Sequence, residues 1–215
     1  MAISLIPTAQ LGLSVLDSML LSGAEISAYD AGSRKFYVTT PENGLLIVDA
    51  DDPTNLELIT TVDFSTEAFG AFGNEVNSVA AHNGIVAVAV ANASKTEPGR
   101  VFLLDVEGKL LNTLTVGALP DMLTFSPDGK TILVANEGER DGTDGLLDAK
   151  GGVSLIDVSR GAALATATTI DFSRFDGQEA ALRAAGVRIF NGKSASLDLE
   201  PEYMWRSPRT ASRRW

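Results

Sequence analysis

One short pattern occurs three times along the chain, and this repetition constrains the fold more than any other feature. Each copy has a short apolar run, a turn rich in Gly, Asn, Asp or Pro, and a second run of β-branched residues. The copies are "AEISAYDAGSRKFYVTT" (24–40), "VNSVAAHNGIVAVAVAN" (76–92) and "PDMLTFSPDGKTILVAN" (120–136). Asn, Asp and Gly tolerate positive φ, so the turns "HNG" and "SPDGK" are typical of β-hairpins. Each copy is therefore predicted to form two antiparallel strands.

Two further strands are expected after each hairpin. The third strand of each repeat places an Asp directly after an apolar run, at Asp49, Asp105 and Asp157. The fourth strands are "LELITTVDFS", "LLNTLTVG" and "ALATATTIDFS". Four short strands per repeat, without helical periodicity, are typical of the blades of a β-propeller.

The sequence thus predicts an all-β fold, an incomplete β-propeller of about three four-stranded antiparallel blades plus the start of a fourth. The expected bounds of the blades within a partial propeller of residues 1–203 are approximately 24–65, 76–117 and 120–173, with the fourth blade starting at 199–203. The segment "DGQEAALRAAGVRIF" (176–190) interrupts this pattern. It predicts one short inserted helix near 177–186, with Asp176 as N-cap and Glu179 three residues later, packed against one face of the propeller.

Several segments, in their order along the chain, resemble the choice-of-anchor I family. They are "AEISAYD", "VNSVAAHNGIVAVAV", "LPDMLTFSPDGK", "ALRAAGVRIF" and "LEPEY", and the segment 119–139 also resembles YVTN and WD-like propeller repeats. The resemblance covers roughly residues 3–203. It implies an exported or surface-anchored bacterial protein with a propeller considerably longer than this chain, and some family members are described as atypical alkaline phosphatases.

The composition excludes several kinds of site. The chain has no cysteine, which excludes thiol catalysis, disulfides and cysteine metal sites. His82 is the only histidine, so histidine triads and multi-histidine metal sites are excluded, and we expect this residue to be structural or exposed in its turn. There is no P-loop, G-x-G-x-x-G or G-x-S-x-G motif, and no unambiguous nucleophile, so no catalytic residue is assigned.

The charge is strongly acidic, at −11 for the whole chain. Residues 1–203 hold 13 Lys and Arg against 28 Asp and Glu, which gives −15. Such a surface repels the phosphates of nucleic acids and suits cations or high-salt surroundings, although an acidity that serves only solubility fits equally well. Nucleic acid is therefore not an expected partner.

The first 23 residues lack Lys and Arg, and Pro7, Gln10 and Asp17 interrupt their apolar run. They match neither a signal peptide nor a membrane span, so membrane insertion is not expected. Without an export signal, retention in the cytoplasm is compatible with this chain, whereas the family resemblance implies an extracellular or cell-surface location.

The last twelve residues, 204–215, form an aberrant basic tail with both tryptophans and four arginines. The repeat requires a strand and a turn such as SPDGK after "PEY", and G/C-rich codons for this tail encode Val-Ala-Val-Ser-Pro-Asp-Gly-Lys in another reading frame. We therefore expect a frameshifted tail on a truncated propeller. The alternative is a basic, aromatic segment that binds membranes or nucleic acids.

The same position of each first strand carries an oxygen-bearing side chain, five residues before the first turn. These residues are Glu25, Asn77, Asp121 and, in the incomplete fourth repeat, Glu202. First strands line the central channel of a propeller, so these side chains are expected to converge near one mouth. Carboxylate and amide oxygens suit Ca²⁺, which takes about six to eight oxygen ligands. In the alternative, these residues bond to the backbone of neighbouring blades and the acids are solvated.

A second, weaker group of metal candidates lies in the acidic segment 136–152. It comprises Glu137, Glu139, Asp141 and Asp144, with Asp148 nearby. The segment lacks the twelve-residue spacing and terminal Glu of an EF-hand, so a solvated loop between the second and third strands is expected.

Two classes of function remain. The first is a non-catalytic module that binds a cation, a small anionic ligand or a surface partner. The second, implied only by the family resemblance, is a Ca²⁺-dependent alkaline phosphatase, or phosphomonoesterase, whose channel-mouth carboxylates hold the metal. Apart from Ca²⁺ no cofactor is expected.

Overall fold

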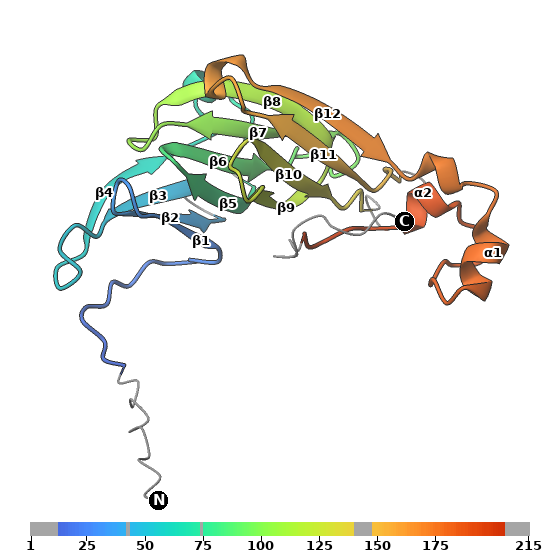
Figure 1. The fold of residues 1–215 in the computed structure, drawn as a ribbon, viewed down its shortest axis with the longest axis horizontal. Coiled ribbons are helices and arrows are strands. Elements are labelled where there is room, and N and C mark those ends of the chain that lie inside the picture. Colours follow the sequence, from blue (N-terminus) through green and yellow to red (C-terminus); the bar gives the residue numbers. More distant parts are fainter. Residues whose placement is uncertain (1–12, 42–43, 74, 140–147, 205–215) are drawn as a thin grey trace, which may run out of the picture.

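A computed structural model describes residues 13–41, 44–73, 75–139 and 148–204. Within these residues, twelve strands form three four-stranded antiparallel sheets, and in each sheet the strands follow the order of the sequence (Figure 1). This confirms the all-β class and the three blades.

Blade 1 contains β1 (Ser27–Asp30), β2 (Lys35–Thr40), β3 (Gly44–Asp49) and β4 (Glu57–Val62). Blade 2 contains β5 (Val76–His82), β6 (Ile85–Val90), β7 (Pro98–Leu104) and β8 (Leu110–Ala118). Blade 3 contains β9 (Pro120–Phe125), β10 (Thr131–Asn136), β11 (Gly152–Asp157) and β12 (Thr166–Asp171).

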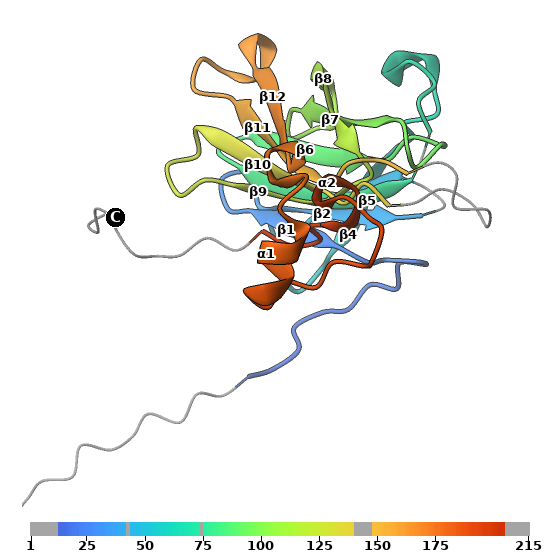
Figure 2. The same cartoon turned by 90° about the vertical axis from the view of Figure 1, so that its right-hand side faces the viewer.

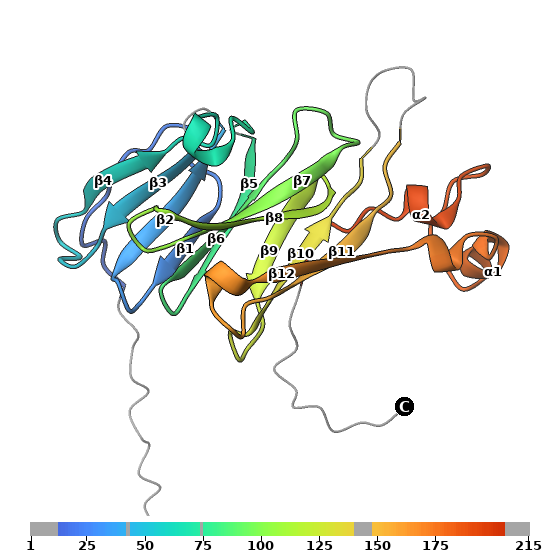
Figure 3. The ribbon, with the colours of Figure 1, turned by 90° about the horizontal axis from the view of Figure 1, so that it is seen from above.

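The blades follow one another as in an open arc of a propeller. The first strands are neighbours, because β5 packs against β1 on one side and β9 on the other. Seen from above, the sheets succeed one another from β1–β4 to β9–β12, and the helices lie beyond blade 3 (Figure 3). In the described part of the chain, the three blades do not close a ring. Short 3-10 turns lie between strands at Glu67–Phe69 and Ala162–Leu164, and a third, Ser173–Phe175, lies between β12 and the first helix.

Strand β6 of blade 2 is buried on both faces, which explains why it shows no polar alternation. Successive side chains of a strand point to opposite faces of the sheet. In β6 the valines Val86, Val88 and Val90 pack against blade 1, while Ala87 and Ala89 pack against blade 3. Each fully buried valine stabilises the fold by roughly 1.5–3 kcal/mol relative to an exposed one.

The repeated Asp after each third strand has a structural role. Asp49, Asp105 and Asp157 each accept hydrogen bonds from backbone N–H groups at distances of 2.8–3.0 Å. The donors lie two to four residues further along the chain, so each carboxylate fixes the turn into the fourth strand.

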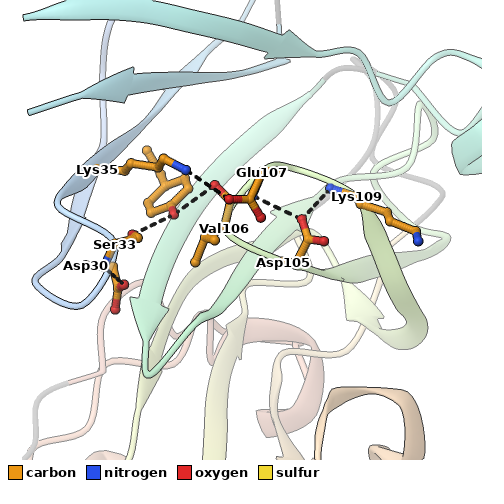
Figure 4. A network of polar contacts seen from close by, with 8 residues as sticks. Asp30, Ser33, Lys35, Asp105, Val106, Glu107 and Lys109 are labelled. Carbon is orange, nitrogen blue, oxygen red and sulfur yellow. Dashed lines mark hydrogen bonds and ion pairs between the residues drawn. The ribbon is translucent and has the colours of Figure 1, made fainter. Parts of the chain in front are cut away.

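A group of polar contacts, which we call the latch, connects Lys35 and Tyr37 of blade 1 to the turn between β7 and β8 (Figure 4). The Lys35 ammonium lies 3.1 Å from the Glu107 carboxylate, and the Tyr37 hydroxyl donates a hydrogen bond of 3.3 Å to the Val106 carbonyl. The Tyr37 hydroxyl also lies 3.3 Å from the Ser33 hydroxyl. Burial raises the pKa of the Tyr37 phenol, which keeps it a hydrogen-bond donor at neutral pH.

His82 packs within the structure, in agreement with its expected structural role. Its ring lies 5.4 Å from the Phe125 ring and against Gly129 of the "SPDGK" turn. Gly129 has φ +67°, and a Cβ at this position would lie 2.3 Å from the His82 ring. Only glycine satisfies both constraints without strain.

The inserted helix is confirmed as α1 (Glu179–Ala184), and a second short helix, α2 (Ala195–Asp198), was not predicted. The predicted N-cap is wrong, because Gln178 occupies that position and no side chain caps the helix. The Asp176 carboxylate instead accepts hydrogen bonds from the backbone and hydroxyl of Ser196, at 2.8 and 2.9 Å. The Asp176 carboxylate therefore does not cap α1 but connects the residues before α1 to α2.

Residues 199–204 lie where a fourth blade was expected to begin, but they are not part of a strand. They run beside β9, where the Met204 N–H lies 3.1 Å from the Met122 sulfur (Figure 1). The tail from 205 to 215 lies outside the described residues, so its origin stays a prediction. Among the helices that the structure describes, none is long and apolar enough to cross a membrane.

Candidate functional site

The inner strands β1, β5 and β9 lie next to one another (Figure 2). A hollow of about 500 Å³ lies along them. Glu25, Asn77 and Asp121, one from each repeat, all line it. Tyr203, which is 76% exposed, lines the hollow as well. The structure thus places three of the four residues predicted from the repeat register around one hollow, whereas Glu202 does not line it. The role of these residues in binding stays a prediction.

Hydrogen bonds between blades fix the positions of these side chains. The Asn77 amide nitrogen donates a bond of 3.1 Å to the Pro120 carbonyl, the residue before Asp121. The buried Ser78 hydroxyl accepts a bond of 3.2 Å from the Leu123 backbone N–H. Asn77 therefore bonds to the backbone of the next blade, as the alternative interpretation expected. This bond uses one of the two N–H donors of the amide, and the carbonyl oxygen is the atom of Asn77 that would contact a cation.

Carboxylates crowd the blade 3 side of the hollow. Burial raises the pKa of Asp121, and the charge of Glu202 raises it further. The pKa of Glu137 is raised from its ordinary value of 4.5 to about 7, first by burial and then by Asp121, Glu139, Glu200 and Glu202. Like charges that raise one another's pKa create a negative potential that favours a cation.

Glu137 was assigned from the sequence to the loop cluster, yet the structure couples it to Asp121 and Glu202. The reason is the pairing of β10 with β9, in which Asn136 lies opposite Pro120. Glu137 directly follows β10, and its N–H donates a hydrogen bond of 2.9 Å to the Leu119 carbonyl, two residues before Asp121. The pairing shifts by one residue between Ala135 and Asn136, so counting outward from the "SPDGK" turn does not give this arrangement.

The expectation of a solvated loop is wrong for the other described members of the acidic segment. The Glu139 carboxylate lies 2.6 Å from the Lys95 ammonium of blade 2. Asp148 forms an ion pair with Lys193 of the insertion, and its side chain is only 8% exposed. These two carboxylates hold neighbouring parts of the structure together. Asp141 and Asp144 lie outside the described residues.

Within the part of the chain that the structure describes, no group of three or more His, Asp or Glu side chains is arranged to hold a metal ion. The candidates Glu25, Asn77, Asp121 and Glu202 therefore share a hollow or a local field without forming a ready coordination shell. The Ca²⁺ site stays a prediction.

Comparison with solved structures found similar folds at low sequence identity. The chain aligns with the hydrazine synthase of Kuenenia stuttgartiensis (13% identity, TM-score 0.37), covering 69% of this chain and 54% of that one. It aligns with a crystal structure of the eukaryotic initiation factor (14%, TM-score 0.43), covering 69% and 32%. It also aligns with the WD40 domain of Toxoplasma gondii coronin (12%, TM-score 0.44), covering 69% and 34%. The aligned part thus spans between about a third and half of these chains.

Comparison with curated proteins found no match. The sequence model of the choice-of-anchor I domain matches residues 25–211. This range includes the three blades, the inserted helices and every described residue of the predicted site. The match confirms the resemblance that the short motifs indicated, and the chain belongs to the choice-of-anchor I domain family.

Proposed function

We propose that this chain is a non-catalytic binding module, and that its hollow binds a positively charged organic group, an ammonium or guanidinium, of a ligand or partner. One observation carries the proposal. The carboxylates of Glu25 and Asp121 and the ring of Tyr203 all line a single hollow beside the three inner strands.

The charge of the hollow supports a cation. None of the described residues that line it is Lys, Arg or His. The raised pKa values of Asp121 and Glu137 mean that carboxylates repel one another there, and a bound cation would relieve this repulsion. An anionic ligand, the other small partner that the sequence suggested, would instead face these carboxylates.

The size of the hollow supports an organic group more than a bare metal ion. A volume of about 500 Å³ falls within the range of small-molecule sites, roughly 300–1,000 Å³. The exposed Tyr203 ring offers a face to an organic cation, an attraction of about 0.5–2 kcal/mol. Ca²⁺ requires several oxygens converging on one point, and Asp121 and Glu25 would have to move to supply them.

We also propose that the module acts at the cell surface, because the family resemblance implies exported or anchored proteins. The alternative activity, phosphomonoester hydrolysis, rests on the same resemblance alone. A fold does not determine which reaction a protein catalyses, so the experiments also measure phosphomonoester hydrolysis.

Isothermal titration calorimetry of the whole chain at pH 8 tests the proposal, with spermidine, CaCl₂ and citrate at matched ionic strength. We expect spermidine to bind and citrate not to bind. Asp121→Asn and Glu25→Gln should each weaken spermidine binding about fivefold or more, because each removes one charge at short range. Tyr203→Ala should weaken spermidine binding without affecting Ca²⁺. The matched control is Glu67→Gln, an exposed carboxylate of the 3-10 turn in blade 1, and it should change nothing.

The same titrations separate the alternatives. Absence of spermidine binding would refute the proposal. Ca²⁺ binding that depends on Asp121, together with spermidine binding that does not, would replace it with a metal site. Hydrolysis of p-nitrophenyl phosphate that requires Ca²⁺ and is lost in Asp121→Asn would replace the binding module with a phosphomonoesterase.

A further inference from the structure

The insertion after blade 3 carries a basic, aromatic surface on an otherwise acidic protein. We call it the Arg–Phe surface, and it comprises Arg174, Phe175, Arg183, Arg188 and Phe190. The Arg174 guanidinium lies over the Phe175 ring, 4.7 Å from its centroid. The Arg188 guanidinium lies over the Phe190 ring at 4.9 Å. Two arginines of the insertion are thus each stacked on an aromatic side chain of the same insertion.

Hydrogen bonds within the insertion hold this surface in place. Arg183 donates to the Ile189 carbonyl at 3.4 Å, and the Phe190 N–H donates to the Asp198 carboxylate at 2.8 Å. Gln178 donates to the Arg174 carbonyl at 2.7 Å. Ile189 is buried, so the segment that bears Arg188 and Phe190 is anchored at its centre. A surface that is ordered before binding loses less conformational entropy when a partner docks.

The three arginines of the Arg–Phe surface form no ion pair among the described residues. The ion pairs there use other cations, namely Arg34, Lys35, Lys95, Lys150 and Lys193. The insertion also has carboxylates, and Asp176, Glu179 and Asp198 accept hydrogen bonds from the insertion's backbone. These carboxylates keep their negative charge, so the positive charge of the surface is local to the three guanidinium groups.

The surface also offers apolar contact. Phe190 is 57% exposed beside the guanidinium stacked on it, and the three arginines are exposed as well. Figure 3 shows α1 and α2 beyond blade 3, with α1 further from the three sheets than α2. Arginine and aromatic residues are enriched in protein–protein interfaces and among the residues that dominate their binding energy. A guanidinium stacked on a ring still presents its N–H fork, which fits a carboxylate bidentately.

We propose that the Arg–Phe surface is a docking surface for a protein partner that presents an acidic segment interspersed with apolar side chains. The arginines pair with carboxylates of the partner, and the exposed Phe190 ring contacts the apolar side chains. The docking surface is independent of the hollow, which has the opposite charge and lies on the inner strands. An anionic polymer would use the arginines but not the apolar contact at Phe190, so the exposed ring favours an acidic polypeptide.

Fluorescence anisotropy with the whole chain tests this docking. The probe is a labelled synthetic peptide of alternating Glu and Leu, with labelled poly-L-glutamate and polyphosphate of equal charge as comparison ligands. We expect the Glu–Leu peptide to bind most tightly. The double variant Arg174→Gln/Arg188→Gln should weaken its binding about tenfold or more, since each charged contact contributes roughly 1 kcal/mol or more. Phe190→Ser should weaken binding of the Glu–Leu peptide but not of polyphosphate.

Two controls keep the result interpretable. Arg160→Gln removes an equally exposed arginine from the turn before β12 and should leave binding within twofold of the original chain. Arg174→Lys/Arg188→Lys keeps the charge but removes the fork, and we expect an intermediate loss. Unchanged binding by the double glutamine variant would overturn the proposal, as would loss that Arg160→Gln reproduces. Polyphosphate binding that exceeds peptide binding, with no effect of Phe190→Ser, would replace the protein partner with an anionic polymer.

Discussion

The raised pKa of Glu137 predicts a specific pH dependence of stability, which Glu137→Gln should remove. The carboxyl group of Glu137 has an ordinary pKa of 4.5 and a pKa of about 7 in the folded chain. Below pH 4.5 the group is protonated whether the chain is folded or unfolded, and it has no effect on stability. Between pH 4.5 and about 7 only the unfolded chain releases the proton freely, so the folded state loses stability as the pH rises. Above pH 7 the full destabilisation is present.

The magnitude follows from the shift. A change from 4.5 to about 7 corresponds to about 3.4 kcal/mol at about 1.36 kcal/mol per pH unit. Glu137 is only half-buried, and solvent screening around a partly exposed group reduces this value to about 1 kcal/mol. For a chain of this size, 1 kcal/mol moves the melting temperature by about 2–4 °C.

Circular dichroism melting at pH 4 and pH 8 provides the measurement. Glutamine resembles the protonated carboxyl group, so Glu137→Gln should melt about 2–4 °C above the original chain at pH 8 and at the same temperature at pH 4. Glu67→Gln, at an exposed position in the 3-10 turn after β4, should change neither value. An equal gain at both pH values, or none at pH 8, would show that burial and the neighbouring carboxylates do not raise the pKa of Glu137 as described.

Three further substitutions test the packing, each read from urea unfolding followed by circular dichroism. Phe102→Ala should cost about 3–5 kcal/mol, because this fully buried ring is the centre of an aromatic cluster, and a cost below about 1 kcal/mol would contradict that packing. Tyr37→Phe should cost about 1 kcal/mol, because the Val106 carbonyl loses its donor in the latch, and an unchanged midpoint would mean that the latch adds nothing. Gly129→Ala should cost about 1–3 kcal/mol because φ is positive and the new Cβ meets the His82 ring, and a stabilised variant would contradict that geometry.

The blades could be predicted because residues close together in the sequence determine their turns and strand pairs. In the "HNG" turn, Asn83 and Gly84 both have positive φ, at 48° and 80°, which is the geometry of a tight hairpin. This turn pairs His82 with Ile85 and so sets the register of β5 against β6. Counting residues from the turn gives the pairs as far as Ser78 and Ala89, but the register shifts between Val76 and Ser78, at Asn77. The convergence of the inner-strand residues could be predicted because the repeat places them at the same position of each first strand.

The insertion was less predictable because distant residues decide its details. The carboxylate of Asp176 stood at a plausible N-cap position, but it bonds to Ser196, twenty residues away in the sequence. Asp148 pairs with Lys193, 45 residues further on. The short helix α2 makes one turn and has no apolar periodicity long enough to recognise. A local signal for a helix therefore located α1 correctly, whereas the contacts that fix the insertion depend on the assembled fold.

The net charge of the sequence does not show where the charged groups lie in the fold. The net charge of −11 predicted a surface that repels anions, and around Asp121 and Glu137 the described carboxylates do create a negative field. The net charge does not indicate the exposed arginines of the insertion. There the Asp176 carboxylate bonds to the backbone, while Arg174 and Arg188 are exposed and stacked on phenylalanine rings. The exposed arginines of the insertion and the carboxylates that line the hollow thus lie on different elements of the fold. A chain that is acidic overall can in this way present a cation-binding hollow and an anion-binding surface on different elements, and the two proposals can fail independently.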